Sequence, residues 1–152
     1  MEEVLLNKVT TVLQPLIDSN NIKEIDFDYG QLEYYDTRPD LNFPAILVEI
    51  DFPNTQSMSF DKTIQHVNAI ITLRIALQVI DESSTRTPIL RRNKALERFS
   101  LNKEVYKLMQ SFTDDETGYF DRISQTQEKR VDGYKVTNMK FAVSFEDHTA
   151  EG

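Results

Sequence analysis

The strongest pattern in the chain is an alternation of apolar and polar positions over residues 64–80, IQHVNAIITLRIALQVI. Every second position from 67 to 79 is apolar, and the even-numbered positions from 66 to 78 include a histidine, an asparagine, an arginine and a glutamine. An alternation of period two predicts a β-strand with one buried face and one wetter face. Because a mean strand has about 5–6 residues, a strand of this length should project beyond its own domain.

Ahead of this strand, residues 2–19 carry apolar side chains at helical spacing, which predicts an amphipathic helix. Pro15 lies near the end of this segment and has no backbone N–H. We therefore expect it to kink the helix or to end its regular part at Gln14.

Two shorter strands are predicted between this helix and the long strand. Residues 24–30 alternate, and their inward side chains are Ile25, Phe27 and Tyr29. Residues 44–52, PAILVEIDF, alternate as well, and Pro53 should end that strand. Residues 53–63 then form a polar loop.

Residues 88–112 are predicted to be helical, but their apolar positions do not all share one face. Leu96 and Phe99 fall nearly opposite the main stripe, which consists of Leu101, Val105, Leu108, Met109 and Phe112. Either a new helix begins at Ser100, a good N-cap residue, or one helix presents apolar side chains to two bodies.

A hairpin signal at Asp132-Gly133 separates two further predicted strands, residues 119–131 and 134–146. In the second of these, the apolar positions change parity after Val136. One register change would place the apolar side chains before and after this point on the same face, which predicts a β-bulge near Thr137-Asn138.

The predicted order is therefore α-β-β-β-α-β-β. Short connections favour an antiparallel or mixed sheet of about five strands, one of them long, with two main helices packed on one face. This is an α+β fold in a single domain, residues 1–148, and residues 149–152 are expected to form a frayed tail.

Charge is distributed unevenly along the chain. The net charge is −8, and residues 1–52 carry all of it, with 11 acidic and 3 basic side chains. Residues 86–107 carry 7 basic and 2 acidic side chains, a net +5. Acidic and basic poles on one chain favour head-to-tail pairing between copies. The alternative is a solvated surface with chance clustering.

No motif in the sequence indicates catalysis or a bound cofactor. The chain has no cysteine, its four glycines are scattered, and its two histidines, His66 and His148, are expected to be solvated. No apolar run reaches the ~18 residues of a membrane span. We therefore expect a protein that is not an enzyme, with no cofactor, no metal site and no membrane contact.

Four carboxylates are expected on the non-core faces of the first two strands: Asp26, Asp28, Glu49 and Asp51. If the strands pair, these groups share one surface. They then form a solvated sheet face, a site for Ca²⁺ or Mg²⁺, or an acidic wall that repels polyanions.

Basic residues of the segment after the long strand, with two apolar residues of the polar loop, are candidates for a subunit interface. They are Arg86, Arg91, Arg92, Lys94, Arg98, Met58 and Phe60. The basic residues would also suit nucleic-acid phosphates, but a sequence pI of about 4.8 argues against a dedicated nucleic-acid binder.

The element order and several segments resemble the tail terminator, or tail completion, proteins of long-tailed bacteriophages and related neck proteins. The resemblance covers about residues 2–147. Its segments are PAILVEIDF, HVNAIITLRIALQVI, a helix ending in LMQSF, and a last strand that contains MKFAVSF.

This resemblance implies a structural virion subunit that closes into a homo-oligomeric ring, with a hexamer favoured. Such a ring ends the tail tube and joins it to the connector or neck proteins of the head. In the implied ring, DNA would pass through an acidic lumen without being specifically bound. The alternative function is a small binding or regulatory domain whose acidic face binds a basic partner or a divalent cation.

Overall fold

The computed structural model describes residues 1–33, 41–78 and 83–152. Its elements, in chain order, are α1 (Glu2–Asp18), β1 (Glu24–Phe27), β2 (Ala45–Ser57), β3 (Gln65–Gln78), α2 (Ile89–Ala95), α3 (Glu97–Met109), β4 (Asp121–Gln127), β5 (Tyr134–Asp147) and the 3₁₀ turn η1 (Thr149–Glu151). The predicted order is confirmed, with the second helix bent into α2 and α3.

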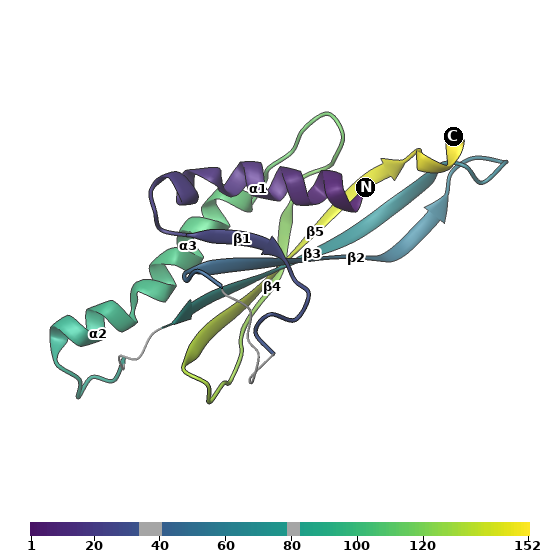
Figure 1. Ribbon diagram of the computed structural model, residues 1–152. Coiled ribbons are helices and arrows are strands. Elements are labelled where there is room, and N and C mark those ends of the chain that lie inside the picture. The colour runs from purple at the N-terminus through teal and green to yellow at the C-terminus, as the bar shows by residue number, and fades with distance from the viewer. Residues whose placement is uncertain (34–40, 79–82) are drawn as a thin grey trace.

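The strands form one mixed sheet in the order β1-β2-β3-β5-β4. β1 runs parallel to β2, and the other neighbouring pairs are antiparallel. The helices lie on one face of this sheet and leave the other face without a helix (Figure 1). The predicted α+β class, the five strands and the one-sided helix layer are therefore confirmed.

β3 is the centre of the sheet, as the long alternation predicts. It pairs with β2 on one side and with β5 on the other, and its register with β5 is continuous from Gln65 to Gln78. Positions 79 and 80 of the predicted strand lie outside the described residues. The side chains of its helix-facing side are all buried: Val67, Ala69, Ile71, Leu73, Ile75 and Leu77.

The helices bury their apolar stripes against this face. α1 contributes Leu5, Val9, Leu13 and Leu16, and α3 contributes Leu101, Val105 and Met109. Asn102 of α3 adds a polar contact, because its Nδ2 donates to Thr137 Oγ1 at 3.0 Å. Thr137 in turn donates to Gln127 Oε1 at 2.8 Å, so α3 is linked to both strands of the last hairpin.

A second, smaller apolar cluster lies on the opposite face of the sheet. It consists of Leu32, Leu47, Ala76, Tyr134 and Val136. The predicted bulge near Thr137-Asn138 is wrong, since β5 pairs with β3 without interruption. The apolar parity changes because the start of β5 buries side chains on the open face, whereas the rest of β5 buries them under the helices.

The register shifts lie in other strands. One falls in β2 between Asp51 and Asn54, and one falls in β4 between Arg122 and Ser124. β2 continues through Pro53, so the prediction that this proline ends the strand is wrong. Beyond Val48 the pairing with β1 has ended, and an unpaired edge with a bulge tolerates a residue that has no N–H.

Two predictions about the first helix and strand are also corrected. α1 continues past Pro15 to Asp18, so its regular part does not end at Gln14. Phe27 and Tyr29 were expected inside but are 39% and 55% exposed. β1 is a short edge strand, and only its Ile25 packs against the main core.

The helical segment bends at Leu96 rather than at Ser100. α2 contributes only Ala95 to the buried set, while Ile89 and Leu90 are 64% and 82% exposed. Of the two predicted alternatives, a new helix beginning at Ser100 is wrong in position. The idea that this segment faces a second body stays a prediction.

Strands β2, β3 and β5 extend beyond the helices at one end of the molecule (Figure 1). We call this end of the sheet the arm: residues 54–70 and 142–151, of which Val67, Ala69, Val143 and Phe145 still belong to the main core. Its far end is the β2–β3 turn together with η1. α2 lies at the opposite end of the molecule (Figure 1).

Neighbouring isoleucines on β3 provide a test of the one-sided core. Ile71 is fully buried, and Ile70 lies on the open face with partial exposure. We expect Ile71→Ala to lower the free energy of unfolding by about 2–5 kcal/mol because it leaves a cavity. Ile70→Ala is the matched control and should cost about 1 kcal/mol. Urea unfolding followed by circular dichroism measures both, and equal losses would contradict the assignment of faces.

Candidate functional site

The four predicted carboxylates do not have equal surroundings. Asp26 pairs in register with Leu47, and Glu49 and Asp51 follow on the same open face of β2. Glu49 and Asp51 are exposed, whereas the Asp28 side chain is only 11% exposed. The structure thus places three of the four on one face and draws the fourth into an ion-pair network.

Arg74 of β3 is the centre of that network. Its guanidinium lies 3.3 Å from Asp28, 2.7 Å from Glu33 and 3.0 Å from Glu128. The Arg74 side chain is only 12% exposed, so these carboxylates replace most of its hydration. Burial lowers the pKa of Arg74, but the hydrogen bonds that it donates to Glu33 and Glu128 outweigh burial, so the pKa rises and the charge is permanent.

Arg130 extends the network to the β4–β5 turn. It lies 2.7 Å from Glu128 and 2.6 Å from Asp132, and its Nη2 donates to the Leu32 carbonyl at 2.8 Å. We call this set the clamp: Asp28, Glu33, Arg74, Glu128, Arg130 and Asp132. It joins the segment after β1 to the β4–β5 turn across the open face, beside the second apolar cluster.

The clamp also shifts the acidity of its carboxylates. Burial raises the pKa of Glu128, but the hydrogen bonds from Arg74 and Arg130 outweigh it and hold that pKa below its ordinary value. Hydrogen bonds from Arg130 lower the pKa of Asp132. Both groups are therefore ionised at neutral pH, as their ion pairs with Arg74 and Arg130 require.

The open face remains acidic after this pairing. The clamp holds four carboxylates against two guanidinium groups, a net −2. Outside it, Glu24, Asp26, Glu49 and Asp51 outnumber Lys140, a basic side chain in register on the same face. Across the ranges 1–33, 41–78 and 83–152, no three potential ligands converge as a metal site would require.

The interface residues predicted from the polar loop lie at the far end of the arm. Met58 is 53% exposed and Phe60 is fully exposed, at 102%. The turn beneath them is held by side chains: Ser59 Oγ accepts from the N–H groups of Thr63 and Ile64 at 3.1 Å, and it donates to Asp61 at 2.8 Å. Hydrogen bonds from Thr63 and Ser59 lower the pKa of Asp61, which keeps this acceptor ionised.

The basic interface residues lie at the opposite end, in and around α2. Arg86, Arg91 and Lys94 are exposed. Arg92 is half-buried, and its Nε donates to the Ser83 carbonyl at 3.2 Å. Arg98 lies over the Phe99 ring, with 4.6 Å from its Cζ to the ring centroid. The structure therefore brings the basic residues together at one end and separates them from Met58 and Phe60.

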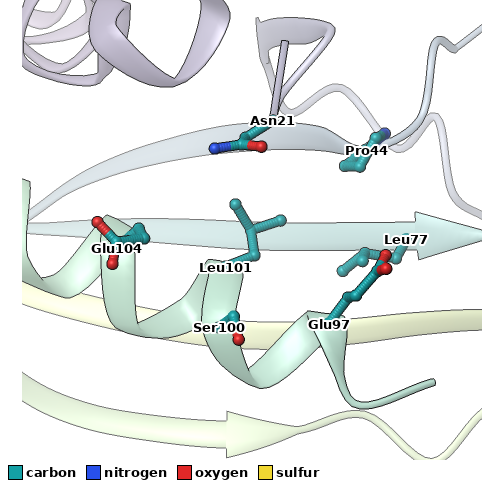
Figure 2. Close-up of a pocket in the computed structure, with 7 residues that line it drawn as sticks. All are labelled: Asn21, Pro44, Leu77, Glu97, Ser100, Leu101 and Glu104. Atoms are coloured by element: carbon teal, nitrogen blue, oxygen red, sulfur yellow. The ribbon is translucent and has the colours of Figure 1, made fainter. Parts of the chain in front are cut away.

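A shallow depression of about 190 Å³ lies between α3, the end of β3 and the α1–β1 connection (Figure 2). It is lined by Asn21, Pro44, Leu77, Glu97, Ser100, Leu101 and Glu104. Figure 2 shows Leu101 directed into it, with Glu97 and Glu104 at either end. Lys107 pairs with Glu104 at 3.5 Å, and no histidine lines the depression to activate Ser100.

Sequence reasoning placed Arg74 among the ordinary residues of β3 and did not foresee the clamp. Its partners are Glu33, which precedes the undescribed residues 34–40, and Glu128, 54 positions away. Spacing along the chain gives no signal for such a contact. The available signal was an arginine on the strand face that also carries the acidic residues of β1 and β2.

No protein-family model matches the chain, and no curated protein matches it. No helix in the described ranges is long and apolar enough to cross a membrane.

Replacing Arg74 tests the clamp. We expect Arg74→Met to lower the free energy of unfolding by about 2–3 kcal/mol, because it leaves Asp28 partly buried without a cation and leaves Glu128 with Arg130 alone. Lys107→Met is the matched control: it removes an exposed ion pair with Glu104 and should cost less than about 0.5 kcal/mol. Chemical unfolding at pH 7 measures both, and a neutral Arg74→Met would show that the clamp does not stabilise the fold.

The clamp also predicts a dependence on pH. Because the folded pKa values of Glu128 and Asp132 lie below 4.5 and 3.8, their stabilisation is present above those values and is lost as pH falls through the folded ones. We expect Arg74→Met to lose less stability than the unsubstituted protein on acidification from pH 5 to pH 2. Parallel acid-dependent slopes for the two proteins would contradict the role of Arg74.

Proposed function

We propose that the protein is a structural subunit of a bacteriophage tail or neck ring that ends the tail tube and joins it to the head connector. The observation that carries the proposal is the placement of exposed apolar side chains at two opposite ends of an elongated subunit. Met58 and Phe60 lie at the arm end, and Ile89 and Leu90 lie on α2.

Two different contact surfaces at opposite ends suit a heterologous, head-to-tail interface. Such an interface generates a ring when the rotation between neighbours closes. A two-fold dimer, by contrast, needs one patch that meets its own copy. The resemblance to tail terminator and neck proteins supports the ring, and the hexamer is the copy number that this resemblance favours.

The open face supports the passage of DNA. It has no helix, and its carboxylates outnumber its cationic groups, with Glu49 and Asp51 exposed. Turned toward a central hole, such a face repels phosphates and lets DNA slide without being bound. The proposed lumen residues are therefore Asp26, Glu49 and Asp51, with Asp28 held in the clamp.

The alternative of a cation-dependent regulatory domain receives less support. Asp28 is paired with Arg74, and the acidic groups of the described segments do not gather around a common point. The exposed apolar ends also have no role in that alternative.

Purified protein provides the test of assembly. Size-exclusion chromatography with light scattering should give closed oligomers, and negative-stain microscopy should show rings with a central hole. Assembly should weaken between about 0.05 M and 0.5 M salt if paired charges contribute, because the Debye length falls below about 10 Å. A strict monomer at millimolar concentration and low salt would contradict the proposal.

A further inference from the structure

The turn at the end of the arm is held by hydrogen bonds and exposes the Phe60 side chain to solvent. Phe60 is fully exposed at its apex, and three side chains on either side of it bond to one another and to the backbone. Lys62 takes a left-handed conformation with φ of 65°, so the turn is locally constrained. A rigid turn that presents an aromatic ring loses little conformational entropy when the ring is buried by a partner.

The same end of the arm is acidic. Residues 58–66 and 144–151 hold four acidic side chains, Asp61, Glu146, Asp147 and Glu151, and one lysine, Lys62, a net −3 with neutral histidines. β5 and β3 bring the two segments together, since Gln65 pairs in register with Asp147 and His66 pairs with Glu146. The aromatic ring therefore stands in an acidic surround.

α2 offers the complementary surface. Ile89 and Leu90 in its first turn are 64% and 82% exposed. Residues 86–98 hold five basic side chains and one acidic one, Glu97, a net +4. An exposed aliphatic pair within a basic surround matches an exposed aromatic ring within an acidic surround, both in polarity and in charge.

We propose that the arm end of one copy docks on α2 of the next copy, with Phe60 packed against Ile89 and Leu90. The two surfaces lie at opposite ends of the subunit, so one chain cannot satisfy both within itself (Figure 1). The occupant of α2 is therefore a second copy of this chain. This inference rests on the proposed function and names the junction between neighbouring subunits of the ring.

A complementation experiment with two variants tests the junction. Phe60→Ser disables the arm end, and Leu90→Ser disables α2. Both side chains are solvent-exposed within a single subunit, so neither change should alter folding, which circular dichroism and thermal unfolding verify. Val131→Ser is the matched control, because Val131 is also fully exposed, at 106%, but belongs to neither surface.

The expected pattern is specific to a head-to-tail junction. Each disabled variant alone should need roughly tenfold or higher protein concentration to assemble. An equimolar mixture of the two should form dimers and nothing larger, since the intact arm of one joins the intact α2 of the other. The double variant should stay monomeric, and Val131→Ser should assemble like the unsubstituted protein. Mass photometry and sedimentation velocity report these species.

A charge exchange tests the electrostatic half of the junction. Lys94→Glu and Glu146→Lys should each weaken assembly, and the protein that carries both changes should recover it in part. If neither change alone weakens assembly at low salt, the proposed charge complementarity is wrong.

The outcomes separate this inference from the proposed function. If the unsubstituted protein forms rings and both disabled variants form them equally well, the proposed function is supported and the proposed junction is wrong. If the mixture of disabled variants yields no dimer, the two surfaces do not meet each other. If the unsubstituted protein never assembles, the proposed function itself fails.

Discussion

The pairing of β3 with strands on both of its sides sets the shape of the whole molecule. Its backbone is satisfied by β2 and β5 along nearly all of its length, so the sheet continues where the helices no longer cover it. α1 and α3 bury the middle of one face, and this burial supplies the main core. The arm is therefore a continuation of the core strands rather than a separate loop, which gives its end a fixed position.

The clamp holds distant parts of the chain together on the open face, as the helices do on the other face. Arg74 and Arg130 connect the segment after β1 to the β4–β5 turn, two parts of the chain that are distant in sequence. Beside them, Leu41 and Phe43 pack against the small cluster around Val136 and Tyr134, and Phe43 stacks on the Tyr134 ring. Because the groups that connect these parts of the chain are charged, the open face keeps a hydrophilic and acidic surface.

The sequence predicted the class, the element order and the central strand because each depends on local periodicity. The prediction failed where one strand buries side chains on both faces of the sheet. This is the case in β5, whose change of apolar parity was interpreted as a bulge. It also failed at Pro53, since a proline on an unpaired edge looks the same in sequence as a proline that ends a strand. Of the candidate site, Met58 and Phe60 were placed in a polar loop from the sequence, and the structure finds both side chains exposed. The Arg74 contacts were not, because they join residues whose proximity only the folded sheet creates.

In the proposed ring of copies joined end to end, the bend at Leu96 would have a further consequence. The edge strand β4 carries a register shift, and so does β2 beyond the end of its pairing with β1, where it also has a proline. Both features discourage growth of the sheet by strand addition. Curvature would then come from the direction in which α2 leaves α3. A change of a few degrees in the angle between α2 and α3 would alter the rotation between neighbouring copies. Leu96 and its neighbours would therefore determine how many copies close the ring.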